Sequence, residues 1–478
     1  MKQTDRCKSS VGQMPRRQFI KYSAAATALA TLGSARAEES SARRPNIIYI
    51  FTDLQSAKMM SCAGNPWVKT PAVDYLAENG VRFERAYTTN PVCVPARTSF
   101  MTGHFPDTYG IRSNGNAKQF KPQAGYEQMH IGAQLQNAGY DIAYGGKVHL
   151  PPELYPDKLG FDVMSRGRGM DLSEDAVDFI QRDHEKPYYL VLSYINPHDI
   201  CYYHRTDLKP KKGNVEILKR AKSDPDFFTN GSCPPLPENF EPQQDEPEAL
   251  QAMKPIKLKN RTALSEEEWR LGRWLYCRLT ETVDAEIQVV LDAIKASGQE
   301  ENTVVIFTSD HGENDASYHL SGKSTFNEES VHIPFIVMDK GGTQQAGRVD
   351  DRHLISNGLD LLPTVLDYAG VPNAKGDSRG RSVRPLVEGR AVPWRDHVGV
   401  EGAFGRMVMN ARFKYIEYDV DQNIEVRLHD MQKDPYEKTH FTADPKHAGD
   451  LADMQQHFKR WFPHEGTLVR NKNKDKEA

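Results

Sequence analysis

A cysteine, a proline and an arginine at alternate positions, Cys93, Pro95 and Arg97, are the residues best suited to chemistry in this 478-residue chain. Proline suits the first position of a helix, where its missing N–H costs nothing, so a helix should begin at Pro95. Cys93 would then lie beside the free N–H groups of that helix, where an anion is favoured. Arg97 would lie one turn after Cys93 on the same face. The alternative is a buried cysteine before an ordinary helix, because free cysteine is among the most buried residue types.

Ionisable residues also follow four apolar runs, each with the composition of a buried strand. These pairs are 46–52 with Asp53, 140–144 with Lys147 and His149, 188–195 with His198, and 303–309 with Asp310 and His311. Helical patterns lie between the runs, for example at 131–138 and 271–296. Strands that alternate with helices predict an α/β fold with a large, mostly parallel sheet flanked by helices.

Ligands bind open α/β sheets at the carboxyl ends of the strands. We therefore expect the four strand ends and the Cys93 loop to converge on one site. Asp53, Asp310 and His311 could hold a hard divalent cation such as Ca²⁺ or Mg²⁺. Each of these residues alone is more often a helix cap or a salt-bridge partner. Three of them together at strand ends indicate a metal site.

Positive charge would come from Lys147 and Lys323, and proton transfer from His149 and His198. A sulfate ester carries negative charge on its non-bridging oxygens, and hydrolysis develops more charge on the bridging oxygen. Lysines and a cation can stabilise the former, and a histidine can protonate the latter. A lone lysine or histidine is more often structural or solvated, so the grouping carries the prediction.

The motif Cys-x-Pro-x-Arg at 93–97, followed by Thr-Ser and Met-Thr-Gly up to residue 103, resembles the signature of the type I sulfatases. These enzymes belong to the alkaline-phosphatase-like superfamily, and the resemblance extends from about Arg44 to the segment around Tyr436. It implies an alkaline-phosphatase-like α/β fold and hydrolysis of a sulfuric ester. It also implies a partner, the formylglycine-generating (sulfatase-maturating) enzyme, which converts Cys93 to formylglycine, an aldehyde that hydrates to a geminal diol.

The resemblance further implies a role for each site residue. Hydrated formylglycine at position 93 attacks sulfur and forms a sulfated enzyme intermediate, while Arg97 orients the diol and offsets its charge. Lys147 and Lys323 bind the sulfate group, and His198 protonates the leaving alcohol. His149 then removes the second diol proton.

In the family, matching acids bind Ca²⁺ together with the formylglycine diol. The resemblance therefore implies four metal ligands here: Asp53, Cys93, Asp310 and His311. The family usually has two adjacent acids, or Asp-Gln, after the first strand. In this chain Leu54 cannot ligate and Gln55 comes one place late. The fourth protein ligand is therefore open, and the imidazole of His311 leaves the identity of the metal open.

Residues 1–37 have the three parts of an export signal. Arg16 and Arg17 precede Phe-Ile-Lys, an Ala-rich run continues to Leu32, and residues 35–37 (Ala-Arg-Ala) form a small-x-small cleavage site. The paired arginines resemble a twin-arginine signal, which the export machinery uses for folded proteins. The apolar run is shorter than the roughly 20 residues of a bilayer span. We therefore expect no stable membrane span and a periplasmic or extracellular protein.

Two further regions are expected in the exported chain. Residues 44–390 would form the catalytic domain, in which 199–265 is rich in Pro, Lys, Asp and Glu and shows little periodicity. We expect an irregular insertion at the rim of the substrate site there, with a solvated surface excursion as the equal alternative. Residues 391–478 would form a small antiparallel-sheet subdomain and a tail. The candidate rim contacts are Tyr202, Tyr203 and His204.

The composition bounds the class of protein. Hydrophobic residues make up 38% and charged residues 26%, with a net charge of −4, as in a globular protein without a nucleic-acid partner. Cys7 belongs to the signal and Cys93 to the proposed site. The other cysteines lack zinc spacing and leave one or two disulfides open: Cys62, Cys201, Cys233 and Cys277.

The predicted function is release of sulfate from a sulfated carbohydrate or an aryl sulfate. One alternative is a phosphate or phosphonate monoester hydrolase of the same superfamily, because the tetrahedral anions are similar. A second alternative is a non-catalytic protein that binds a sulfated glycan and whose Cys93 is never converted. The presence of Leu54 in place of an acid motivates this second alternative.

Overall fold

The computed structural model of the chain describes residues 44–463 except 166–168, 206–208, 210, 244, 253–262, 343–345 and 373–374. The chain divides into two units, Met1–Arg44 and Pro45–Ala478, and the description below concerns the second unit. The signal expected at 1–37 and the tail after residue 463 lie outside the described residues.

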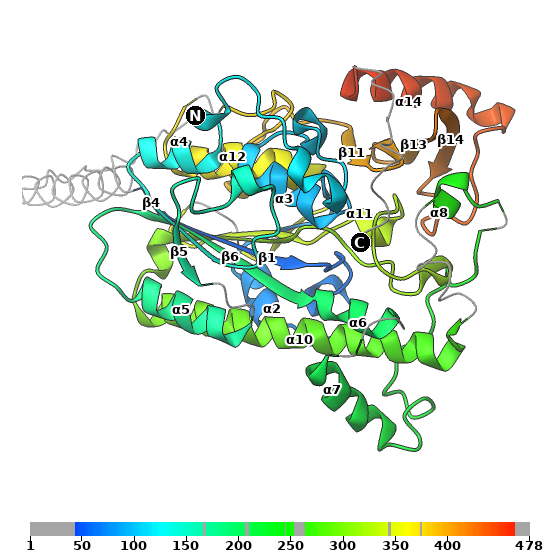
Figure 1. The fold of residues 1–478 in the computed structure, drawn as a ribbon, viewed down its shortest axis with the longest axis horizontal. Helices are drawn as coiled ribbons and strands as arrows, with labels where there is room; N and C mark the ends of the chain where they lie inside the picture. Colours follow the sequence, from blue (N-terminus) through cyan, green and yellow to red (C-terminus); the bar gives the residue numbers. More distant parts are fainter. Residues whose placement is uncertain are drawn as a thin grey trace, which may run out of the picture. The chain divides into compact units, whose positions relative to one another are not determined.

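An eight-stranded sheet forms the centre of the fold (Figure 1). Its strands are β1 (Asn46–Asp53), β2 (Val81–Phe83), β4 (Asp141–Gly146), β5 (Asp162–Ser165), β6 (Tyr188–Pro197), β7 (Thr303–Ser309), β8 (Phe335–Asp339) and β9 (Arg348–Asp350). They lie in the order β5-β4-β6-β1-β7-β8-β2-β9. Only β8 runs antiparallel to its neighbours β7 and β2. The predicted large, mostly parallel sheet is therefore confirmed.

Helices cover both faces of this sheet because its central strand is apolar on both sides, with every residue of β1 buried. Ile47 and Tyr49 face one core, and Ile48 and Ile50 face the other. The first core is closed by α3 (Cys93–Thr102), α4 (Ile131–Asn137) and α12 (Asn357–Tyr368). The second is closed by α2 (Pro71–Glu78), α5 (Met170–Ile180) and α10 (Glu266–Ala296). Figure 1 shows these two helical layers on opposite sides of the sheet.

The long helix α10 begins at Glu266, earlier than the start predicted at residue 271. A capping box lies directly before the apolar pattern. The Ser265 side chain accepts a hydrogen bond from the Glu268 N–H, and the Glu268 carboxylate accepts one from the Ser265 N–H. Glutamates fill the first turn, where they also suit the positive end of the helix dipole.

The segment 199–265 is only partly irregular, which corrects the sequence prediction. It contains α6 (Cys201–His204), α7 (Lys212–Lys222) and α8 (Glu248–Ala252). The pattern of α7 is hard to recognise because few of its positions are covered, one of the covered residues is polar, and the apolar Val215 is exposed. These covered positions are Asn214, Ile217, Leu218 and Ala221.

The C-terminal part contains the small antiparallel sheet that the sequence predicts. Its strands lie in the order β11 (Val398–Gly402), β12 (Gly405–Met409), β13 (Phe413–Val420) and β14 (Asn423–Asp430). Helix α14 (Ala448–Trp461) packs on this sheet through Met454 and Phe458 (Figure 1). The remaining elements are short: β3 (Ala86–Tyr87), β10 (Ile355–Ser356), α11 (Glu328–Val331) and α13 (Arg384–Val387).

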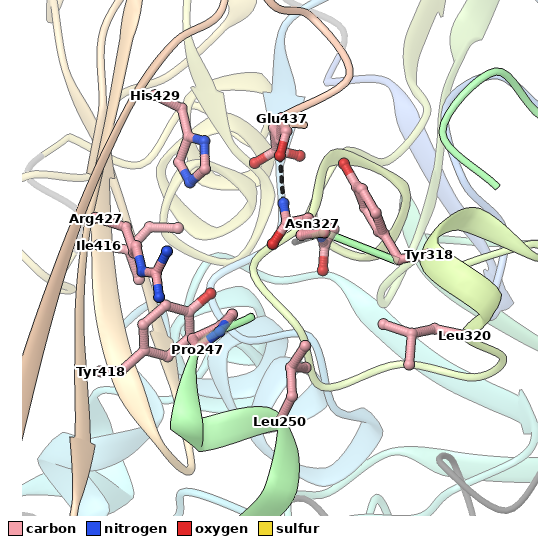
Figure 2. A pocket seen from close by; sticks show the side chains of 11 residues that line it. Pro247, Leu250, Tyr318, Leu320, Asn327, Ile416, Tyr418, Arg427, His429 and Glu437 are labelled. Carbon is pink, nitrogen blue, oxygen red and sulfur yellow. Dashed lines mark hydrogen bonds between the residues drawn. The ribbon is translucent and has the colours of Figure 1, made fainter. Parts of the chain in front are cut away.

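Polar contacts join this C-terminal sheet to the chain around 318–327. A small cavity of about 10 Å³ lies between them (Figure 2). Gln243 lines this cavity, and its side chain donates to the Glu437 carbonyl oxygen. Lys414 on β13 is fully buried, and its ammonium lies 2.8 Å from the Glu437 carboxylate and 3.1 Å from the Phe326 carbonyl oxygen. The C-terminal sheet therefore fixes the segment that directly follows residue 323.

The described residues contain neither a disulfide nor a helix that could cross a membrane. Within the described ranges, every helix is too short or too polar for a bilayer span. The disulfides left open by the sequence are thus not formed among these residues. The free thiols are those of Cys62, Cys93, Cys201, Cys233 and Cys277.

Candidate active site

The segments that carry the predicted site residues meet at the carboxyl edge of the sheet. β1 lies between β6 and β7, and Asp53 is its last residue. Lys147 follows β4, His198 follows β6, and Asp310 follows β7. Cys93 opens α3 beside them, because its sulfur lies 3.7 Å from Asp53 Oδ1. The predicted convergence of strand ends on the cysteine is therefore present.

Helix α3 begins at Cys93 itself, before the start predicted at Pro95. Pro95 still lies in the first turn, where backbone N–H groups have no intrahelical partner, so its missing N–H costs no hydrogen bond. The Asn114 side chain accepts a hydrogen bond of 3.1 Å from the Val94 N–H, which caps this end of the helix. Every residue of α3 is buried, so the cysteine is enclosed at a helix start.

The Cys93 thiol lies among charged groups. Its Sγ is 2.6 Å from Lys323 Nζ, 3.2 Å from His311 Nε2 and 3.7 Å from Asp53 Oδ1. Burial and Asp53 raise the pKa of this thiol, but Lys323, Lys147 and His311 outweigh them and hold the pKa well below its ordinary value. The surroundings therefore favour negative charge at position 93.

Arg97 cross-links the strand ends around this cysteine. Nη2 donates to Asp53 Oδ2 at 2.8 Å, and Nε donates to Asp310 Oδ2 at 2.9 Å. Nη1 donates to the Lys147 carbonyl oxygen at 2.8 Å and to Ser193 Oγ at 2.9 Å. Burial lowers the pKa of Arg97, but Asp310 and Asp53 raise it above its ordinary value, so the guanidinium stays charged.

Ser193 is a site residue that the sequence analysis did not assign. It lies inside the apolar run of β6, and its hydroxyl is fully buried against Arg97. The one available signal was a small polar residue in an otherwise apolar and aromatic run. Such residues are common in buried strands, so this signal alone would not have singled out Ser193.

Four buried side chains bring ligand atoms within 4.8 Å of one another: Asp53, Cys93, Asp310 and His311. Because Arg97 takes the Oδ2 atoms of both aspartates, their Oδ1 atoms face this cluster. His311 Nδ1 lies 3.1 Å from the Gly312 carbonyl oxygen, which places the ring proton on Nδ1 and leaves Nε2 able to ligate. Two carboxylate oxygens and an imidazole nitrogen fit a divalent cation.

The charges at the cluster also favour a cation. Burial and the neighbouring Asp53 raise the pKa of Asp310, because two carboxylates lie close together. The Lys323 ammonium lies against three of the four ligand atoms, 2.6 Å from Cys93 Sγ, 3.0 Å from His311 Nε2 and 3.8 Å from Asp53 Oδ1. This lysine thus places positive charge where a metal ion would contact the same atoms.

The loop that carries Lys323 is fixed through its backbone. The Gly322 N–H donates to the carboxylate of Glu313, which is fully buried. The Ser324 N–H donates to the Pro91 carbonyl oxygen at 3.1 Å. Gly322 and Ser324 have φ values of 79° and 83°, so both residues beside the lysine have left-handed backbone. Glu313 is therefore a second residue that the sequence analysis missed, although it lies two positions after His311.

Neither residue after Asp53 supplies a further metal ligand. The Leu54 side chain enters an apolar cluster, while its N–H donates to Asp310 Oδ1 at 3.2 Å. The Gln55 side chain accepts from Thr52 Oγ1 and donates to the Met59 carbonyl oxygen, both at 2.9 Å. The protein part of the cluster therefore consists of two aspartates, one histidine and position 93.

Lys147 and His198 complete the site. Lys147 Nζ donates to Asp53 Oδ2 at 2.5 Å. Burial lowers the pKa of His198 to about 3, so its imidazole is neutral at pH 7. His198 Nδ1 is buried and has no hydrogen-bond partner within the part of the chain that the structure describes. His149 is exposed on the loop after Lys147, and its predicted role as a base stays a prediction.

Of the candidate rim contacts, Tyr202 lies near α7, whereas Tyr203 and His204 lie against α10. The Tyr202 ring lies 4.8 Å from Lys211 Nζ, near the start of α7. Tyr203 donates its hydroxyl hydrogen to a backbone carbonyl of α10 at 2.8 Å, and the ring of buried His204 lies 5.8 Å from that of Trp269, also on α10. Tyr203 and His204 therefore support the packing of α6 on α10, and Tyr202 keeps its place among the candidates.

Comparison with known proteins decides the family. A protein-family model for sulfatases matches residues 45–165 and 152–371, which include every site residue described above. The chain belongs to the sulfatase family. A second model, for the C-terminal part of N-sulphoglucosamine sulphohydrolase, matches residues 317–462 of this sulfatase. A model of the twin-arginine translocation signal matches residues 13–33, so the sulfatase carries a signal for export.

Named relatives cover most of this sulfatase. A Δ4,5-hexuronate-2-O-sulfatase of Bacteroides thetaiotaomicron is 27% identical over 86% of this chain and 87% of its own. An ulvan-active sulfatase of Formosa agariphila is 30% identical over 72% of this chain and 65% of its own. A solved structure of a 2-O GAG sulfatase superposes with a TM-score of 0.75 at 25% identity, over 88% of this chain and 92% of the other. The fold is thus that of a sulfatase, a sulfuric ester hydrolase.

Proposed function

We propose that this sulfatase releases inorganic sulfate from a sulfated carbohydrate, with a formylglycine made from Cys93 as nucleophile and Ca²⁺ at the four-residue cluster. The supporting observation is the setting of Cys93. Its sulfur is buried between the Asp53 carboxylate and the Lys323 ammonium, with Arg97 holding both aspartates in place. An ordinary structural cysteine has no need of such charged neighbours.

The Cys93 sulfur stands in for an oxygen of the hydrated aldehyde. In that position the oxygen is surrounded by the groups that hold the thiol pKa low, so loss of its proton is favoured. Asp53, Asp310, His311 and position 93 would hold the cation. When bound, a divalent cation would stabilise negative charge on the oxygens beside it.

The lysines of the site would bind the sulfate ester, and the histidines would transfer protons. Lys323 and Lys147 lie on two sides of Asp53 and can bind the non-bridging oxygens of a sulfate group. Burial keeps His198 neutral in the free enzyme, whereas the negative charge of a bound sulfate ester would favour its imidazolium form. As the imidazolium, His198 would give its proton to the bridging oxygen as the alcohol leaves. His149, on the same loop as Lys147, would take the second diol proton.

The carbohydrate class is supported by what the relatives act on. One relative is named for a hexuronate sulfate, another for ulvan and a solved structure for a glycosaminoglycan. We assign residues 1–37 to the export signal, 44–390 to the catalytic domain with its rim insertion, and 391–478 to the C-terminal subdomain. Export through the twin-arginine route would deliver the enzyme to the periplasm or the extracellular space, where it would act on its sulfated substrate.

The test combines product release with the chemistry of position 93. The protein, produced in a host with a formylglycine-generating enzyme, is assayed for sulfate release from defined sulfated saccharides, an aryl sulfate and an aryl phosphate. We expect sulfate esters to be favoured and the tryptic peptide across position 93 to carry the aldehyde by mass spectrometry. An unmodified thiol in active protein, or faster turnover of the phosphate, would overturn the proposal.

A further inference from the structure

A dense group of basic side chains precedes and follows the start of α7. Six of them are exposed in a segment whose one acidic residue is Glu216: Lys209, Lys211, Lys212, Lys219, Arg220 and Lys222. The chain as a whole is acidic, with a net charge of −4. This segment is therefore strongly basic, although the net charge of the whole protein is negative.

The helix presents these charges on one side. Asn214, Ile217, Leu218 and Ala221 are the covered positions, and the last three belong to or pack on an apolar cluster with residues of α10. Lys212 and Lys219 lie opposite these covered positions on the 3.6-residue period, and Arg220 and Lys222 lie at the flanks. Figure 1 shows α7 next to α10, at the lower edge of the view. Glu216 pairs with Lys219 at 2.9 Å, and the five other basic side chains leave the segment positive.

The basic helix is attached directly to the turn after His198. The Asn214 side chain, which is almost fully buried, donates to the Asp199 carbonyl oxygen at 2.8 Å. Lys211 Nζ lies 3.9 Å from Asp199 Oδ1 and 4.8 Å from the Tyr202 ring. The positive surface therefore begins one residue from the predicted acid of the active site and extends along α7 for about 16 Å.

We propose that the exposed basic face of α7, together with Lys209 and Lys211, binds the polyanionic chain of a sulfated polysaccharide next to the residue being desulfated. This inference rests on the proposed function and narrows its substrate to a polymer. Charge complementarity favours this occupant, since each sulfate along the chain can meet a lysine or arginine. Surface charges act over about 8 Å at physiological salt, so the face would also steer the polymer to the site.

The test uses a charge-reversal variant of the full chain, Lys219→Glu, Arg220→Glu and Lys222→Glu. A matched control reverses three exposed basic residues on the C-terminal subdomain, Lys446→Glu, Lys459→Glu and Arg460→Glu. Retention of both variants is measured on immobilised dextran sulfate, each with Cys93→Ala to remove turnover. Active versions are assayed on a sulfated polysaccharide and on an aryl sulfate at low and high salt.

We expect the α7 variant to lose roughly tenfold or more in kcat/KM on the polysaccharide, mainly through KM, with a flatter salt dependence. Its aryl sulfatase activity and thermal midpoint should match those of the control. Unchanged dextran sulfate retention, or an equal loss in the control, would overturn the assignment. So would selective loss of binding to phosphatidylglycerol vesicles with polymer binding intact. Absence of aryl sulfatase activity in the unmutated enzyme would instead count against the proposed function.

Discussion

The ammonium of Lys323 lies 2.6 Å from the sulfur of Cys93. It also lies 3.0 Å from His311 Nε2, so a single side chain contacts both the proposed nucleophile position and a candidate metal ligand. A charge at this place can stabilise negative charge on the nucleophile and on an incoming sulfate group. Lys323 thus joins two parts of the site that come from distant segments of the chain.

Replacing Lys323 should therefore impair turnover far more than folding. We expect Lys323→Ala to lower kcat/KM on an aryl sulfate by roughly 100- to 1,000-fold, the usual cost of removing one stabilising group from an active site. Steady-state kinetics measure this loss, with Lys340→Ala, a surface lysine paired with Glu300, as the control. Activity near that of the control would remove Lys323 from the mechanism.

Glu313 should act on turnover through Lys323, because its carboxylate accepts the Gly322 N–H. We expect Glu313→Ala to lower kcat/KM tenfold or more, and Glu313→Gln, which keeps an acceptor oxygen, to recover most of it. In a Lys323→Ala background, Glu313→Ala should add little, as a double-mutant cycle would show. Glu329→Ala is the matched control, since Glu329 accepts instead from the Asn239 side chain.

Arg97 should be essential to stability because it neutralises two buried carboxylates. Arg97→Met leaves Asp53 and Asp310 without their shared partner, and removing one member of a buried ion pair costs about 3–5 kcal/mol. Urea unfolding in the absence of divalent cations measures this loss. Arg82→Met breaks a pair with the half-exposed Glu84 and should cost under about 1 kcal/mol. Equal losses would contradict the assigned role of Arg97.

Removal of divalent cations should lower both activity and thermal stability. A ligand that binds only the folded state stabilises it by about 2.7 kcal/mol at a concentration of 100 times its dissociation constant. We expect chelation to reduce the thermal midpoint, added Ca²⁺ to restore it, and His311→Ala to abolish this response. His353→Ala, next to Asp350 and away from the cluster, should respond like the unmutated protein. A midpoint insensitive to both chelator and Ca²⁺ would argue against a metal site.

His429 should make the protein less stable in acid. Burial, followed by the charge of Lys414, lowers its pKa to about 3, and its Nδ1 lies 2.8 Å from the Thr439 carbonyl oxygen. Figure 2 shows the His429 ring among the side chains that line the small cavity. Because the unfolded state takes up a proton near pH 6.5 and the folded state does not, the free energy of unfolding falls as pH drops from about 6.5 toward 3.

Urea unfolding between pH 4 and 7 measures this dependence. His429→Gln should flatten the slope over that interval, since glutamine does not titrate. An identical slope in His429→Gln and in the unmutated protein would show that other groups carry the acid sensitivity.

The sequence predicted the site where composition changes abruptly at a strand end. Asp53, Lys147, His198 and Asp310 each follow a run of apolar residues, and parallel strands bring such ends to one edge. The position of Cys93 followed from its motif. The helix start was misplaced because proline is tolerated anywhere in the first turn, so Pro95 did not fix where α3 begins.

Other features depend on tertiary contacts that leave little trace in sequence. Ser193 and Glu313 act through hydrogen bonds to a distant arginine and to a backbone N–H, and neither residue type is unusual where it occurs. The sequence does not predict α7, because few of its positions are covered. The Leu54 side chain packs in an apolar cluster and the Gln55 side chain bonds to the Met59 carbonyl oxygen. The backbone path after β1 determines both orientations, and the sequence does not show that path.

The complete burial of Cys93 in the first turn of α3 has a consequence for the order of events in the cell. A modifying enzyme needs access to this thiol, and the folded chain offers none. The twin-arginine route, in turn, carries proteins that have already folded. If Cys93 is converted as proposed, conversion would come first, folding second and passage across the membrane last, so the formylglycine would be made before the signal directs the enzyme to export.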